Sequence, residues 1–229
     1  GVGDRGVGRA DDDDVVHLAP PGQALVETNE GNEMRKVIVQ EFMSLDGVVQ
    51  APGGDDEDTS GGFRHGGWQM DYLDDASVER ILAGIHAAGG FLLGRGTYEI
   101  FASYWPHTGR QEAAAFAEPL NSKPKWVASR TLSGELEWEH ATLLSGDAAE
   151  AVAELKAGDG GDLHVIGSPG LVRSLIAADL VDELQLVVYP LVLGGGKRIL
   201  SDDGELRRLR LVEATPTSTG AIHVTYAPA

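Results

Sequence analysis

The chain has 229 residues, of which 42% are hydrophobic and 24% charged, a composition typical of a soluble globular protein that buries its own core. Its 36 acidic and 18 basic residues give a formal net charge of -18, which argues against nucleic acid and anionic membranes as partners. The absence of cysteine excludes disulfides, thiolate zinc sites and a cysteine nucleophile, and it fits a cytoplasmic location. We expect neither a membrane span nor a signal peptide.

Residues 1–33 differ in character from the rest of the chain. They are rich in Gly, Asp and Pro, contain four consecutive aspartates at 11–14, and show no sustained hydrophobic period. Low hydrophobicity and clustered like charge predict a disordered acidic tail, either native or an artefact of cloning or of gene-start assignment. A functional acidic arm is the alternative. We expect the folded domain to span residues 34–229.

Strand-like and helix-like segments alternate from Met34 onward. In the first half, hydrophobic patterns predict strands over residues 36–42, 91–93 and 125–129 and helices over 74–88 and 97–104. Asp74 or Asp75 is expected to cap the first helix, and a loop rich in Gly and Asp precedes it at 53–67.

The second half continues the alternation. Helices are predicted over residues 147–157 and 171–178, strands over 163–166 and 183–189, and a closing antiparallel pair over 208–214 and 221–226. This order predicts an α/β fold with a mostly parallel central sheet, helices on both faces and an antiparallel C-terminal strand pair. Ligands bind such sheets at the carboxyl ends of the strands, so the loops after Phe42, Leu93, Val127 and Ile166 are expected to carry the chemistry.

Two of these loops combine a hydroxyl group with an arginine. One holds Gly94, Arg95 and Thr97, and the other holds Ser129 and Arg130. Free N–H groups at a helix start and the fork of an arginine side chain both bind phosphate. The first loop is explained equally well as a plain turn with Thr97 as N-cap. If the two loops lie on neighbouring strands, they form one basic pocket suited to the 2′-phosphate of NADPH.

A third loop follows the predicted strand 163–166 and opens a helix. Its Gly167, Ser168 and Leu171 form a candidate cradle for a pyrophosphate. No loop carries the complete glycine fingerprint of an ordinary Rossmann dehydrogenase, which we therefore rank last. The run Gly-Gly-Gly-Lys-Arg at 194–198 lacks the Ser or Thr of a P-loop and is better explained as a turn.

Candidate substrate residues follow the first strand. Asp46 lies where a reacting substrate is expected, although an Asp-Gly pair is also a common turn. Trp68 follows a glycine-rich stretch, where its ring would cover a flat substrate, and a role in the core explains it equally well. The seven histidines form no His-Glu-x-x-His pattern or close ligand pair, so no metal site is expected.

Five motifs in a fixed order resemble a known superfamily. They are SLDG at 44–47, GRGTYE at 94–99, SRTL at 129–132, VIGSPGLV at 165–172 and VDELQLVVYPLVLGGGKRIL at 181–200. Together they are similar to the dihydrofolate reductase-like superfamily, and most similar to the branch related to the reductase domain of the bifunctional riboflavin-biosynthesis deaminase–reductase. The resemblance covers about residues 34–229 and implies a dihydrofolate reductase-like fold with NADPH as cofactor.

The resemblance also implies roles for individual residues. By position, the phosphates of the cofactor are held by Gly94, Arg95 and Thr97, its 2′-phosphate by Ser129 and Arg130, and its pyrophosphate by the step that begins at Gly167. Ser168 replaces the second glycine of that step, where its side chain would either crowd the cofactor or add a hydrogen bond.

On the substrate side, the resemblance implies that the Ser-Leu-Asp-Gly segment flanks the substrate and the nicotinamide, which favours Ser44, Asp46 and Gly47. Dihydrofolate reductases also use a carboxylate on the first helix. Three aspartates lie near that segment, at positions 71, 74 and 75, and none matches it cleanly.

We therefore expect an NADPH-dependent reductase of a small pteridine- or pyrimidine-type heterocycle, with Asp46 delivering or relaying the proton. The alternative is a non-catalytic dinucleotide- or flavin-type binding module of the same fold. A phosphorylated ribosylaminopyrimidine would use Lys197 and Arg198 for its phosphate, whereas dihydrofolate would require a buried carboxylate and an apolar slot. The apolar strand 184–193 is a candidate surface for a homodimer.

Overall fold

The computed structural model describes Gly1 and residues 34–229 except Ser201. Within these, the compact unit is Met34–Ala229. Apart from Gly1, the predicted acidic tail lies outside the described residues, so that expectation stays a prediction.

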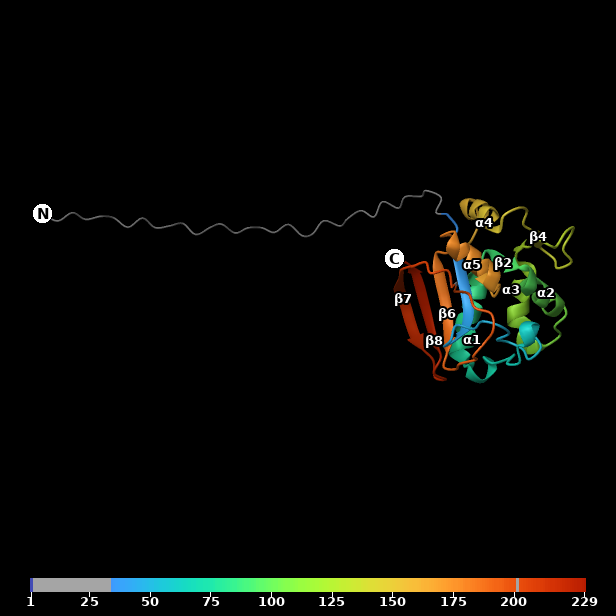
Figure 1. Ribbon diagram of the computed structural model, residues 1–229, viewed down its shortest axis with the longest axis horizontal. Helices are drawn as coiled ribbons and strands as arrows, with labels where there is room; N and C mark the ends of the chain where they lie inside the picture. The colour runs from blue at the N-terminus through green and yellow to red at the C-terminus, as the bar shows by residue number, and fades with distance from the viewer. Residues whose placement is uncertain (2–33, 201) are drawn as a thin grey trace. The chain divides into compact units, whose positions relative to one another are not determined.

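An eight-stranded sheet forms the centre of the unit in the order β4-β3-β2-β5-β1-β6-β8-β7 (Figure 1). The strands are β1 (Val37–Ser44), β2 (Gly90–Gly94), β3 (Lys125–Ala128), β4 (Ala141–Leu143), β5 (Leu163–Ile166), β6 (Glu183–Tyr189), β7 (Leu209–Pro216) and β8 (Ile222–Pro228). Pairing is parallel from β4 through β6, whereas β8 joins β6 and β7 in antiparallel fashion. The predicted mostly parallel sheet with an antiparallel C-terminal pair is confirmed.

Among the described residues, five α-helices cover the two faces of the sheet. They are α1 (Asp75–Ala87), α2 (Arg95–Tyr104), α3 (Ala114–Ser122), α4 (Ala148–Ala157) and α5 (Pro169–Ala177). Short 3-10 turns are η1 (Ser60–Gly62), η2 (Met70–Tyr72) and η3 (Gln111–Ala113). None of the helices in the described part of the chain has the length and apolarity needed to cross a lipid bilayer.

The strand β2 shows how the core is divided between the two faces. Successive side chains of a strand point to opposite sides of a sheet. Leu92 accordingly packs into the cluster that includes residues of α4 and α5, while Phe91 and Leu93 pack into the cluster that includes residues of α1, α2 and α3. All three side chains are buried, as expected for a parallel strand covered on both sides.

Two of the helices begin at an aspartate cap. The carboxylate of Asp74 accepts a hydrogen bond from the Ser77 N–H, which identifies Asp74 rather than Asp75 as the cap of α1. Asp147 caps α4 by accepting from the N–H groups of Ala149 and Glu150.

Two elements of the fold are absent from the pattern-based prediction. The helix α3 is nine residues long and carries Pro119 in its interior, and a proline there weakens any helical signal. The strand β4 has three residues, and none of them is fully buried. Both elements are held by tertiary contacts that local periodicity does not report.

The strand predicted as a dimer surface lies inside the sheet. β6 pairs with β1 on one side and with β8 on the other, so its backbone is not available to a second chain. The edge strand on this side of the sheet is β7, which exposes Leu209, Leu211 and Val212. The homodimer stays a prediction.

At the amino end of β3, a buried lysine has hydrogen-bond acceptors for its ammonium group. The Lys125 ammonium donates to the carbonyl oxygens of Leu120, Asn121 and Lys123 at 2.8, 2.9 and 2.8 Å. It also lies 4.5 Å from the centre of the Trp138 ring. Burial lowers the pKa of Lys125 to about 8. This lysine ties the end of α3 to the sheet.

Candidate functional site

A cleft of about 1510 Å³ runs along the carboxyl ends of the parallel strands. Residues 49–58 after β1, 94–97 after β2, 128–130 after β3 and 166–171 after β5 contribute to its lining. These are the loops in which the sequence predicts the chemistry.

The segments at the ends of β2 and β5 are tied to each other in the lining of the cleft. The Gly94 N–H donates to the Ser168 hydroxyl at 2.8 Å. A β-carbon at Gly167, whose φ is +63°, would lie 3.2 Å from the Thr97 hydroxyl oxygen. Ser168 also adopts a left-handed conformation, with φ 65°. The buried serine that replaces the second glycine therefore links the two loops through its hydroxyl group.

Two helices begin at this junction. The helix α2 starts at Arg95 with Gly94 as its N-cap, so the alternative in which Thr97 is the N-cap is wrong. The helix α5 starts at Pro169, and Leu171 in its first turn is buried against the cleft. The first N–H groups of a helix lack intrahelical acceptors and carry the positive end of the helix dipole. Both helix starts therefore suit an anion.

The predicted arginines lie on neighbouring strands. β2 and β3 are paired, and Arg95 and Arg130 follow their last residues and line the same cleft. Arg95 forms an exposed ion pair with Glu99 at 3.2 Å, which contributes little and leaves the guanidinium available. The Ser129 hydroxyl accepts from two backbone N–H groups of the turn that presents Arg130. This end of the cleft is cationic.

A buried carboxyl group lies at the other end of the cleft. Glu41 near the end of β1 is 2% exposed and lines the cleft. Its Oε1 atom has no hydrogen-bond partner among the residues that the structure describes. Burial and the nearby Glu57 carboxylate raise the pKa of Glu41 well above its usual value. Gln40, on the opposite side of the strand, also lines the cleft with a buried, unpartnered Oε1.

The loop at 53–58 adds further acidic groups. The Glu57 carboxylate accepts from the N–H groups of Gly53 and Gly54 at 2.7 and 3.2 Å, and burial raises its pKa. Asp58 forms an ion pair with Lys197 at 2.6 Å. Asp55 and Asp56 also line the cleft, which makes this end acidic.

Asp46 has a structural setting outside the cleft lining. Its carboxylate accepts from the Ser44 hydroxyl at 2.7 Å and from the N–H groups of Leu193 and Gly194 at 3.1 and 2.9 Å. The Ser44 hydrogen bond is the main cause of a lowered pKa for Asp46. Asp46 therefore stays ionised and holds the 193–198 loop. Ser44 and Gly47 also lie outside the lining of the cleft.

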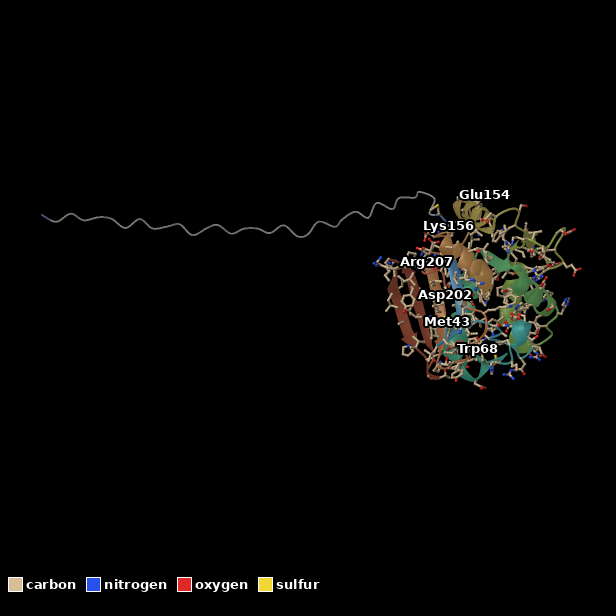
Figure 2. All side chains as sticks on the ribbon, in the orientation of Figure 1. Met43, Trp68, Glu154, Lys156, Asp202 and Arg207 are labelled. Atoms are coloured by element: carbon tan, nitrogen blue, oxygen red, sulfur yellow. The ribbon has the colours of Figure 1, made fainter. Side chains whose placement is uncertain are left out.

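Trp68 belongs to a small aromatic cluster. Its indole N–H donates to the Gln50 carbonyl at 2.7 Å, and its ring meets Tyr189 edge-on with centroids 5.4 Å apart. Figure 2 labels Trp68 below Met43, toward the end of the sheet where β1 finishes. This ring packs against the cluster around Tyr189 and is not part of the cleft lining.

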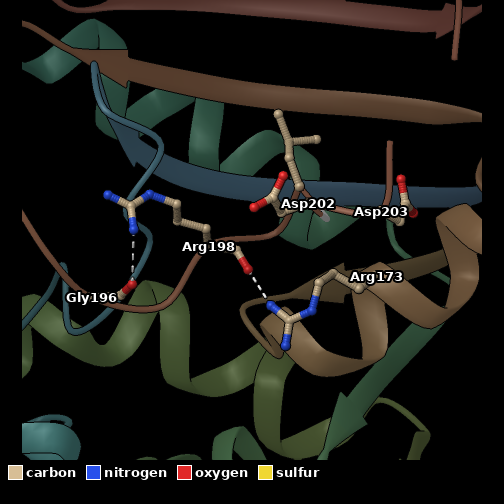
Figure 3. Close-up of a pocket in the computed structure, with 6 residues that line it drawn as sticks. Arg173, Gly196, Arg198, Asp202 and Asp203 are labelled. Carbon is tan, nitrogen blue, oxygen red and sulfur yellow. Dashed lines mark hydrogen bonds between the residues drawn. The ribbon is translucent and has the colours of Figure 1, made fainter. Parts of the chain in front are cut away.

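A smaller pocket of about 430 Å³ lies beside α5 (Figure 3). Arg173 donates to the Arg198 carbonyl there, and the Arg198 side chain contacts the Gly196 carbonyl and the Asp46 carboxylate. Lys197 is paired with Asp58. Both basic residues predicted to bind a substrate phosphate are therefore engaged in ion pairs.

Sequence reasoning missed Glu41. The strand 36–42 alternates in polarity, which on its own suggests that its polar side chains face solvent. The signal that identifies Glu41 is its position two residues after Val39 and four after Val37, both of which are fully buried. An acidic residue on that face of a central parallel strand lies in the core or in a ligand site.

Comparison with known proteins agrees with this architecture. The family model of the RibD C-terminal domain matches residues 35–223. The uncharacterized protein YyaP of Bacillus subtilis (strain 168) is 26% identical over 199 residues, which are 85% of this chain and 95% of YyaP.

Two solved structures show the shared fold. The putative riboflavin biosynthesis protein of Shewanella sp. PV-4 has a TM-score of 0.65 at 21% identity and covers 85% of this chain and 99% of its own. The dihydrofolate reductase of Enterococcus faecalis, complexed with NADP(H) and RAB-propyl, has a TM-score of 0.53 at 15% identity and covers 84% of this chain and 96% of its own. The expected dihydrofolate reductase-like fold is confirmed, and the chain belongs to the RibD C-terminal domain family, a family of the pyrimidine- and pteridine-reductase type.

Proposed function

We propose that this protein is an NADPH-dependent reductase of a small heterocyclic substrate. The observation that carries the proposal is that Arg95, Arg130 and two helix starts line the same cleft of a strongly acidic protein. A net charge of -18 repels an anion, so only a local set of donors retains one.

The residues of the cationic end fit a dinucleotide with a third phosphate. Gly96 in the first turn of α2 has nothing within 4 Å of the position its β-carbon would occupy, which lets a pyrophosphate approach the backbone closely. Arg95 and Arg130 provide planar, bidentate donors for the 2′-phosphate. When bound, NADPH supplies the hydride.

The wall formed by α1 suits a flat ring. Of the described residues, α1 contributes only apolar side chains to the lining of the cleft, namely Val78, Ile81 and Ile85. An apolar wall with a few polar groups at one end orients a small ligand and excludes water from it.

A change at Arg130 tests the proposal through its effect on cofactor choice. We expect Arg130→Ala to weaken the binding of NADPH by at least about tenfold, because it removes a charge-assisted bidentate contact to the 2′-phosphate. NADH, which lacks that phosphate, should change by less than about twofold. The measurement is cofactor fluorescence in titrations of both dinucleotides.

The exposed Arg210 on β7 lies outside the cleft and provides the matched control, Arg210→Ala. Equal losses for NADPH and NADH in Arg130→Ala would contradict the assignment of Arg130. No binding of NADPH to the wild type at millimolar concentration would end the proposal.

A second candidate is a dinucleotide-binding module without catalysis. The observation that favours it is the all-apolar contribution of α1, because the resemblance to dihydrofolate reductases implies an acid on this helix. Asp74 and Asp75 lie outside the lining of the cleft. The Asp74 carboxylate already accepts hydrogen bonds from the Ser77 N–H and the Ser218 hydroxyl. NADPH binding without oxidation across a panel of pteridines and aminopyrimidines would support this candidate.

A further inference from the structure

The cleft is electrically divided along the sheet. Arg95 and Arg130 follow β2 and β3, whereas Glu41 and the acidic loop 53–58 belong to β1 and the segment after it. Three strand spacings, roughly 14 Å, separate β3 from β1. One elongated site therefore has a cationic end and an acidic end.

We propose that the acidic end binds an unphosphorylated heterocycle, uncharged or cationic, and that the Glu41 carboxyl is the protonated group that touches it and delivers its proton. This inference rests on the proposed function and names the substrate class and the acid for the same site.

The charges of the acidic end exclude a phosphorylated substrate. Asp55, Asp56 and Glu57 face a single lysine in the lining of this end, and that lysine is already paired with Asp58. A phosphate brought here would meet several carboxylates at close range, and Lys197, the lysine of this end, is already held by one of them. An uncharged or cationic ring avoids this repulsion.

The unpartnered oxygen of Glu41 points to a ligand. Buried polar atoms in proteins almost always have a hydrogen-bond partner, and exceptions call for an explanation. Glu57, the neighbouring acid, is satisfied by two backbone N–H groups, whereas Glu41 Oε1 has no partner among the described residues. Because Glu41 also lines the cleft, a bound heterocycle can supply the missing partner.

The surroundings of Glu41 keep its proton in place. On β6 its register partner is Leu186, which offers no charge, and the charged group that acts on it is Glu57. Burial and a neighbouring acidic group both favour the neutral form of a carboxyl, because two adjacent negative charges in a poorly solvated site are unfavourable. A neutral carboxyl both donates and accepts, and so matches a ring with a carbonyl or imine group.

The chemical step is balanced. The Glu41 O–H bond breaks, and a new O–H or N–H bond forms at the heteroatom of the C=O or C=N group whose carbon takes a hydride from a reduced nicotinamide. The π electron pair of that group becomes the pair that binds the proton. Glu41 is left as a carboxylate and regains a proton from solvent.

Matched pairs of probes test the substrate class. The full chain, saturated with NADP⁺, is titrated in a calorimeter with a ribosylaminouracil and with neopterin, each with and without a terminal phosphate. We expect at least one unphosphorylated compound to bind, about tenfold or more tighter than its phosphate. Tighter or equal binding of the phosphate, or binding of none of the four compounds, overturns the assignment.

Two substitutions test the role of Glu41 itself. Glu41→Gln keeps a neutral donor and acceptor, so it should bind the preferred probe within about twofold of the wild type, while turnover falls about a hundredfold or more. Glu41→Leu removes both the donor and the acceptor and should weaken the binding of the probe about tenfold. Wild-type affinity for Glu41→Leu, or wild-type turnover for Glu41→Gln, would overturn the role of Glu41.

Infrared spectroscopy gives a readout that needs no substrate. At pH 7 the wild type should show a carbonyl band of a protonated carboxyl group that disappears in Glu41→Gln. The absence of that band in the wild type would also overturn the inference. NADPH binding by the same samples separates the two proposals, because it should persist in both Glu41 variants if the cationic end is assigned correctly.

Discussion

Glu41 and Lys125 are two buried ionisable groups at opposite ends of the same sheet. Lys125 at the start of β3 is 0% exposed and donates to three carbonyl groups. Glu41 near the end of β1 is 2% exposed and has an oxygen without a partner in the described part of the chain.

The difference between them separates stability from function. A buried charge with all its partners in place joins elements together, and its removal leaves those partners unpaired. A buried group without partners costs free energy in the empty protein and gains its partner from a ligand. Lys125 at the amino end therefore serves the fold, whereas Glu41 at the carboxyl end is assigned to the ligand.

Removing the satisfied lysine should have the largest effect on stability. Lys125→Met leaves three carbonyl groups without their donor, and we expect the free energy of unfolding to fall by about 4 kcal/mol. Urea denaturation measures the change, and NADPH affinity of the folded fraction should stay the same. Lys36→Met, at a lysine 55% exposed in an ion pair with Glu183, is the control and should cost less than about 1 kcal/mol. Equal losses of stability in Lys125→Met and Lys36→Met would contradict the special role of the buried lysine.

His164 on β5 extends the comparison to pH. Burial lowers the pKa of His164 from 6.5 to about 4, so the unfolded chain takes up the proton first as the solution is acidified. The stabilising contribution is complete above pH 6.5 and is lost as the pH falls toward 4, by up to about 3 kcal/mol.

Urea denaturation at a series of pH values measures this loss. His164→Leu should flatten the dependence between pH 6.5 and 4, whereas the exposed His140→Asn should keep the wild-type slope. An unchanged slope in His164→Leu would show that other groups control acid stability.

The unsatisfied acid should act on stability in the opposite direction. Glu41→Leu replaces a buried carboxyl that lacks a partner with an apolar side chain, and we expect the free energy of unfolding to rise by about 1.5 kcal/mol. Urea denaturation at pH 7 checks the sign. A loss of stability would mean that Glu41 serves the fold in the way that Lys125 does.

Asp46 sharpens the comparison at the carboxyl end, because it is an acid with its partners in place. Asp46→Asn keeps one acceptor oxygen for two backbone N–H groups, so it should cost about 1 kcal/mol of stability. Turnover should fall less than about threefold, since Asp46 lies outside the cleft lining. A hundredfold loss of turnover at unchanged NADPH affinity would restore Asp46 as the catalytic acid and exclude Glu41.

The cationic end of the site could be predicted from the sequence because its residues lie next to the strands that position them. Gly94 ends a short apolar strand that Arg95 follows, and Ser129 and Arg130 come after the next one along the sheet; parallel strands bring their carboxyl ends to one edge. Whether the two arginines share one cleft then depends only on whether β2 and β3 are neighbours in the sheet. The pattern of strands and helices likewise predicts the fold class, while α3 and β4 depend on tertiary contacts.

The acidic end could not be predicted because it depends on contacts between residues that are far apart in the sequence. Asp46 accepts hydrogen bonds from the N–H groups of Leu193 and Gly194, which lie 147 and 148 residues further along the chain, so the local sequence shows its Asp-Gly turn but not its role in holding the 193–198 loop. Glu41 was overlooked because an alternating strand suggests one solvent-facing side. β1 lies between β5 and β6, and a central parallel strand has no such side.

A crystal structure of the protein with NADPH tests the central claim most directly. The account predicts that the 2′-phosphate lies within hydrogen-bonding distance, about 3 Å, of the guanidinium groups of both Arg95 and Arg130. A 2′-phosphate bound elsewhere, or a cofactor seated in the smaller pocket beside α5, would contradict it.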